Sequence, residues 1–117
     1  MPGSEGVVLA RAVELIINGR VEEALEVLSS YYGIPKPRLK IGLPKGCLNA
    51  YGCYNPRRQT IYVRSSEEYM NPFIILHEYY HHLRGWPGVH RGSERHADEY
   101  ALNAIRLWRE LKRLGLL

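Results

Sequence analysis

The chain has 117 residues, of which 45% are hydrophobic and 24% charged, which is typical of a globular protein and leaves little room for a second core. We therefore expect one domain over residues 1–117. No apolar run is long enough to span a bilayer, and the start MPGSEGVV lacks the regions of a signal peptide. These features favour a cytoplasmic protein without membrane contact. The formal net charge of +4 also leaves an anionic partner open.

Two amphipathic helices are predicted at the N-terminus. The first runs from Glu5 to Asn18, where apolar residues recur at helical spacing before a glycine. The second runs from about Arg20 to Tyr31 and ends before Gly33 and Pro35. The pair is compatible with a DNA-reading helix-turn-helix, but acidic side chains on the second helix would repel phosphates, so we set that function aside.

Short apolar runs separated by Gly, Pro and Asn predict β-strands between residues 35 and 66. The first run is RLKIG. The runs Leu48 to Tyr54 and Gln59 to Arg64 flank NPRR, in which Pro56 suits the second position of a tight turn. We expect these two runs to form an antiparallel hairpin, with Gly52 marking a bulge or a close backbone approach.

The same region is basic. Between Lys36 and Arg64 the sequence contains Lys and Arg residues but no Asp or Glu. Such a segment can attract nucleic acid, an anionic surface or an acidic polypeptide. Because no recognised nucleic-acid-binding motif accompanies it, a solvated basic face is the favoured interpretation, and nucleic acid binding is an alternative.

Two cysteines, Cys47 and Cys53, are compatible with free thiols, a local disulfide or a metal site. In the reducing compartment expected here, buried thiols are favoured. A disulfide would require oxidising conditions or a thermophilic source.

The next helix is predicted from an Asn71 cap to Arg84, and it carries the sequence LHEYYHH. At about 100° per residue, His77 and His81 lie one turn apart on the same face, so both imidazoles can reach one ion. Glu78 lies beside that face, where a carboxylate can take a proton from a metal-bound water. This is the HExxH arrangement of two zinc ligands and a general base.

A hydrolytic zinc site typically has a third protein ligand. One known pattern places Gly and His three and six residues after the second His, but this chain has Arg84 and Pro87 there. Cys47, in KGCLN, is another option and has a faint resemblance to the ligand strand of peptide deformylases. The other deformylase motifs are missing, so neither option is favoured.

A last helix, predicted from a Ser93 cap to about Arg113 after a loop over Gly85 to Gly92, supplies the favoured third ligand. One stripe of this helix contains Glu94, Ala97, Asp98, Ala101 and Ile105. The alanines would let it approach the histidine helix closely. Glu94 could then bind the ion, and Asp98 could accept a hydrogen bond from the other nitrogen of a zinc-bound histidine.

HEYYH followed by ERHAD resembles the gluzincin metallopeptidases, and the similarity covers Asn71 to Ala101. ERHADEYA is also similar to the glutamate helix of ImmA/IrrE-like metallopeptidases, and the length is most like the minigluzincins. The resemblance implies a zincin-like α+β fold. In it, two N-terminal helices and a small antiparallel sheet precede an active-site helix and a C-terminal glutamate helix.

Residue by residue, the resemblance implies Zn²⁺ held by His77, His81 and Glu94, with Glu78 as the general base and Asp98 supporting a ligand. The implied activity is hydrolysis of peptide or protein substrates. As a separate hypothesis, an extended substrate could add main-chain hydrogen bonds at the edge of the predicted hairpin. The resemblance also implies a C-terminal segment, here LKRLGLL, that covers the cleft as an inhibitor. The alternative function is a catalytically weak zincin-fold protein, DNA-associated or regulatory, that uses the basic segment for binding.

Overall fold

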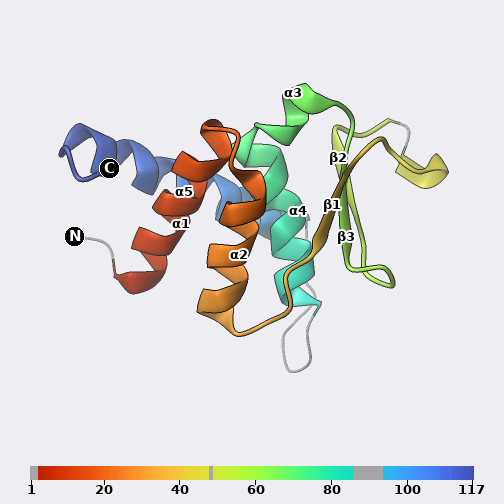
Figure 1. Ribbon diagram of the computed structural model, residues 1–117, viewed down its shortest axis with the longest axis horizontal. Helices are drawn as coiled ribbons and strands as arrows, with labels where there is room; N and C mark the ends of the chain where they lie inside the picture. The colour runs from red at the N-terminus through yellow and green to blue at the C-terminus, as the bar shows by residue number, and fades with distance from the viewer. Residues whose placement is uncertain (1–2, 48, 86–93) are drawn as a thin grey trace.

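The computed structural model describes residues 3–47, 49–85 and 94–117 and opens with two antiparallel helices (Figure 1). They are α1, Ser4–Ile17, and α2, Val21–Tyr32, within one or two residues of the predicted spans. Their apolar sides meet in the core. Gly33, at φ 70°, ends α2 in the left-handed conformation that glycine adopts without steric cost.

Three short strands form one sheet in the order β1-β3-β2: β1 is Arg38–Ile41, β2 is Gly52–Asn55 and β3 is Thr60–Val63. The predicted antiparallel hairpin is confirmed by the pairing of β2 with β3. The prediction of an entirely antiparallel sheet is wrong, because β1 runs parallel to β3. With β2 on one side of β3, β1 uses the other side and becomes the second edge strand.

The long connection between β1 and β2 contains a short 3-10 helix, η1, Lys45–Cys47, that the sequence did not predict. The strand expected from residue 48 begins only at Gly52; Leu48 itself lies outside the described residues. Cys47 and Cys53 form a disulfide, so the favoured interpretation of two thiols is wrong. The bond joins the end of η1 to β2.

Two longer helices complete the fold: α4, Pro72–Arg84, and α5, Glu94–Arg113, after the short α3, Ser66–Tyr69. The predicted cap is confirmed, since the Asn71 side chain accepts hydrogen bonds from two backbone N–H groups of α4 at 2.9 and 3.3 Å. The predicted Ser93 cap and residues 86–92 of the predicted loop lie outside the described residues.

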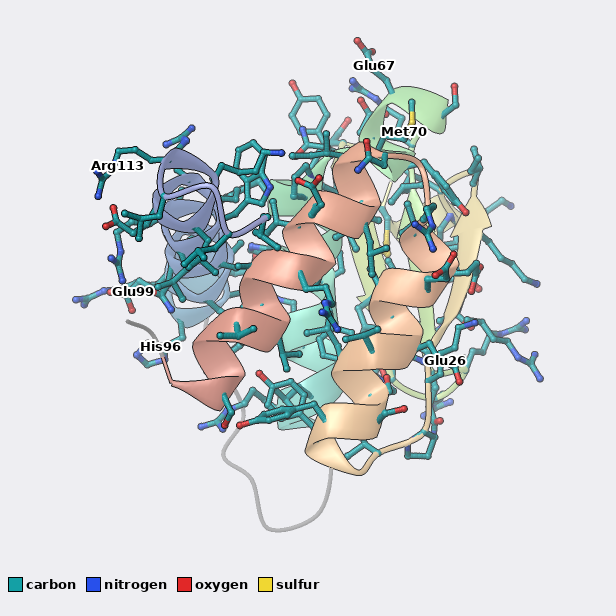
Figure 2. All side chains as sticks on the ribbon, turned by 60° about the vertical axis from the view of Figure 1, so that its left-hand side comes forward. Glu26, Glu67, Met70, His96, Glu99 and Arg113 are labelled. Atoms are coloured by element: carbon teal, nitrogen blue, oxygen red, sulfur yellow. A yellow bond between two sulfur atoms is a disulfide. The ribbon has the colours of Figure 1, made fainter. Side chains whose placement is uncertain are left out.

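Helix α4 lies between the sheet and the remaining helices (Figure 1). One cluster of fully buried side chains links α1, α2, β3, α4 and α5, and its largest member is Tyr79. Charged side chains such as Glu26, Glu99 and Arg113 project outward from the helices (Figure 2). The fold is therefore α+β, as predicted, with the helices on one side of the sheet.

No helix in the described ranges combines the length and apolar character needed to cross a membrane. The longest, α5, is strongly amphipathic: its buried residues are Ala97, Ala101, Ala104 and Leu111, and charged residues cover the other side.

Candidate metal centre

Helix α4 presents opposite faces to the core and to a cleft. Ile75, Leu76 and Tyr79 are fully buried and fix the helix against the rest of the protein. His77 and His81 lie on another face, with 5.1 Å between their ring centroids. Helical periodicity thus brings the two imidazoles together, as the spacing predicted.

Helix α5 brings a carboxylate to both imidazoles. One oxygen of Glu94 lies 2.9 Å from His77 Nε2, and the other lies 2.7 Å from His81 Nε2. Helices α4 and α5 pack closely against each other, and the small side chains Ala97 and Ala101 of α5 are fully buried. The two helices therefore converge at the residues selected from the sequence.

Asp98, one turn after Glu94, reaches the other nitrogen of His77. Its Oδ1 lies 2.8 Å from His77 Nδ1, which can donate its hydrogen to the carboxylate. That bond leaves the lone pair of Nε2 directed toward Glu94. A metal-bound histidine commonly has such a carboxylate partner, which fixes its tautomer and its ring orientation.

The donor atoms fit a shared cation. The ligand atoms of His77, Glu78 and His81 lie within 4.8 Å of one another, so this group could hold a metal ion. His81 Nε2 is buried and makes no hydrogen bond of acceptable geometry, although a Glu94 oxygen is 2.7 Å away. A buried nitrogen that faces a carboxylate at this distance without an acceptable hydrogen bond matches the position of a metal ligand.

Burial also changes the protonation of the cluster. Desolvation raises the pKa of Glu78 to about 7, against the opposing effect of His77, and Glu94 raises it further. Burial lowers the pKa of His81, which outweighs the opposite effect of Glu94. A neutral His81 keeps its lone pair available as a metal ligand.

Strand β2 confines Glu78 from the other side. A Cβ placed on Gly52 would lie 2.8 Å from Ile74 Cγ2 and 3.4 Å from Glu78 Cγ. The predicted close backbone approach at this glycine is therefore confirmed. A side chain at this position would separate β2 from α4.

A cleft of about 630 Å³ opens beside the cluster. Glu78, His81 and Glu94 line it together with residues from β2 and the disulfide. Arg84 also lines this cleft, one turn beyond His81, and was not singled out from the sequence. Its spacing of three residues from His81 was the signal that it would face the same way.

The second histidine of the pair HH, His82, supports α4 from behind. Its Nδ1 lies 2.7 Å from the Tyr54 hydroxyl on β2, and its Nε2 lies 2.8 Å from the Pro35 carbonyl oxygen. These distances fit an Nε2–H donor and an Nδ1 acceptor. The fully buried ring thus ties the helix to β2 and to the segment that leads into β1.

The C-terminal segment lies away from the cleft. Glu94 begins α5 at the candidate metal centre, and the helix then extends for 20 residues, or about 30 Å. Near its other end, Trp108 donates a hydrogen bond to Glu14 on α1. In this arrangement LKRLGLL does not lie over the cleft (Figure 1), and self-inhibition by this segment stays a prediction.

The disulfide also excludes one alternative for the third metal ligand. The sulfur of Cys47 is bonded to that of Cys53, so Cys47 is not free to act as the third ligand that was considered beside Glu94.

The cluster of His77, His81, Glu94 and Asp98 is a candidate metal centre between two helices. No protein-family model, curated protein or solved structure matches the chain.

Proposed function

We propose that the protein is a zinc-dependent peptidase of the gluzincin type. The observation that supports this most strongly is the approach of both Glu94 oxygens to the Nε2 atoms of His77 and His81, at 2.9 and 2.7 Å. Two imidazoles and one carboxylate, with an open cleft beside them, are a ligand set used by hydrolytic zinc sites.

The roles of the residues follow from their places. His77, His81 and Glu94 would hold the ion, and Asp98 would keep His77 in the tautomer whose Nε2 is free. When bound, zinc supplies Lewis-acid chemistry: it polarises a carbonyl group and acidifies water. Glu78, 4.0 Å from His77 Nε2 and facing the cleft, would accept the proton of the attacking water and deliver it to the leaving amine.

Strand β2 offers a place for an extended substrate, because it is an edge strand and lines the cleft. Tyr51 O accepts a hydrogen bond from Arg64 N at 2.9 Å, so Tyr51 faces β3. Antiparallel pairing alternates, which turns the peptide groups of Gly52 and Tyr54 toward the open edge. A peptide added there would lie beside Glu78.

Arg84 favours substrates with an acidic residue. It lines the cleft, its Nε is buried without a hydrogen bond, and no carboxylate forms an ion pair with it in residues 3–47, 49–85 and 94–117. The guanidinium carbon of Arg84 lies 5.6 Å from the centroid of the Tyr80 ring. A substrate carboxylate would supply the charged hydrogen bonds that the guanidinium lacks.

Metal analysis of the purified protein tests the proposal, with Glu94→Ala beside the wild type. The wild type should retain one zinc per chain through dialysis, and the variant should lose it. Absence of stoichiometric zinc from the wild type, or retention by the variant with equal affinity, would contradict the metal site.

A test of catalytic activity requires a second variant. Glu78→Gln should keep zinc and lose peptide hydrolysis by at least about a hundredfold, because it removes the base and leaves the ligands. Cleavage of a library of fluorescence-quenched peptides measures the rate of hydrolysis. Equal cleavage by the variant and the wild type would exclude the proposed role of Glu78.

A further inference from the structure

The face of the sheet opposite α4 carries a second site, separate from the cleft. A hollow of about 290 Å³ lies there. Its basic lining residues come from β1, the segment before it and the β2–β3 turn, and are Lys36, Arg38, Lys40, Arg57 and Arg58. Gln59, Thr60 and Tyr62 complete the lining, and no carboxylate contributes to it.

The register of the strands determines which face of the sheet carries part of this positive charge. Leu39 pairs with Ile61, and these two side chains pack toward the core. Alternation along the strands therefore turns Arg38 and Lys40 to the other face, beside Tyr62. The two cations are exposed and Tyr62 is half-buried.

The turn that carries Arg57 and Arg58 is held in place. Asn55 Oδ1 accepts hydrogen bonds from both of their backbone N–H groups, at 3.0 and 3.2 Å. The Arg38 backbone N–H donates to the Gln59 carbonyl at 2.9 Å, which joins the turn to the start of β1. These bonds thus hold together the backbone segments from which the basic side chains project.

Little of this charge is neutralised within the protein. Lys36 Nζ lies 2.8 Å from Glu22 and 3.8 Å from Glu26. The four other cations, Arg38, Lys40, Arg57 and Arg58, form no ion pair with the described residues. Four fixed positive charges around one hollow are a strong attraction for a polyanion.

We propose that this face binds single-stranded nucleic acid through its phosphate backbone. Phosphodiester groups carry a charge at every nucleotide, and arginine and lysine are their usual partners. Tyr62 offers an aromatic ring among the cations, the combination used by proteins that bind single strands without sequence preference. An acidic polypeptide is less favoured, because the lining provides no apolar pocket for an anchoring side chain.

Fluorescence anisotropy with a short labelled DNA or RNA strand tests this inference on the whole chain. Binding should weaken linearly with salt on logarithmic axes, with a slope of about −3 for four phosphate contacts on a single strand. Arg57→Ser/Arg58→Ser should lower the affinity by about tenfold at low salt and reduce the slope by about half. Lys40→Ser, in another element, should cause a smaller loss.

Arg11→Ser/Arg109→Ser is the matched control, because it removes two exposed charges from α1 and α5, away from the sheet. Its affinity should remain near that of the wild type. The inference is overturned if no strand binds at low salt, or if both double variants weaken binding equally. Equal competition by a polyglutamate peptide would also overturn it. Circular dichroism checks that each variant is folded, and the binding readout does not depend on hydrolysis.

Discussion

At Gly52 the absence of a side chain lets β2 lie against the carboxylate-bearing face of α4. We expect Gly52→Ala to destabilise the protein by about 1–3 kcal/mol, because the new Cβ would overlap Ile74 and press on Glu78. It should also lower the proposed peptidase activity. Urea unfolding and peptide hydrolysis measure the two effects.

Gly46 provides the matched control, since a Cβ there would meet no atom within 4 Å. Gly46→Ala should leave both measurements close to wild type. If the two substitutions had equal effects, the close approach at Gly52 would have no special importance.

Arg84 should determine which peptides are cleaved. Arg84→Gln removes the charge that lines the cleft, so the preference in kcat/KM for acidic over neutral peptides should fall about tenfold, the equivalent of one charged hydrogen bond. Paired substrates that differ in one Glu or Gln measure this ratio. Arg109→Gln, exposed on α5, should leave the ratio unchanged. Cleavage of both peptides with no preference in the wild type would refute this role but not the peptidase itself.

Single residues were predictable from sequence where helical spacing alone determines their position. His77, His81, Glu94 and Asp98 come together because each pair occupies one face of a regular helix, and the alanines of α5 allow the two faces to meet. Their roles as ligands remain predictions. The Cys47–Cys53 disulfide was not predicted, because it depends on the path of η1 rather than on spacing in the sequence.

The edge strand β2 is the element on which substrate binding can be tested. Tyr54→Pro removes an N–H that the alternation of the ladder turns toward the open edge, so KM should rise about fivefold, as expected for one lost hydrogen bond of about 1 kcal/mol. Steady-state kinetics measure the change. An unaltered KM would show that peptides bind elsewhere.

The control, Tyr54→Phe, separates the effect of the backbone N–H on KM from that of the side chain. Tyr54→Phe loses only the hydroxyl that lies 2.7 Å from His82 Nδ1 and keeps the backbone N–H. Its KM should therefore stay near the wild-type value. If both variants raised KM equally, the cause would be the lost support of α4 rather than the sheet edge.

Elements with local signals were the most predictable. The caps and apolar periodicity of α1, α2 and α4 gave their spans to within one or two residues, and the tight turn at Pro56 gave the hairpin. The strand RLKIG was predicted and corresponds to β1, but its parallel pairing with β3 was not, because strand order depends on tertiary packing rather than on local sequence. The short α3 was also missed, since four residues contain too little periodicity.

For the whole molecule, the long α5 separates the chain's C-terminal segment from the candidate metal centre. Deletion of residues 114–117 should therefore change kcat/KM by less than about twofold, because exposed groups distant from a site contribute little to it. Hydrolysis assays of the full and shortened chains give the comparison. A large increase in activity would show that the segment reaches the cleft in solution.

A cation at the centre would join α4 to α5 and so stabilise the entire fold. Zinc at a hundred times its Kd should add about 2.7 kcal/mol to the free energy of unfolding and raise Tm by about 10 °C. Differential scanning calorimetry with and without zinc measures the rise. Each variant is compared with its own metal-free form, so that intrinsic changes in stability cancel.

The loss of the zinc-induced rise in Tm should be larger in a variant whose substituted residue lies closer to the ion. Glu94→Ala should abolish most of the rise in Tm, because it removes the carboxylate that lies near both imidazoles. Asp98→Ala should reduce the rise only in part, since loss of a partner that orients a ligand typically costs 10–100-fold in affinity. Equal zinc-induced rises in Tm for the wild type and Glu94→Ala would mean that the ion does not link the two helices, and the proposed centre would then lack its third ligand.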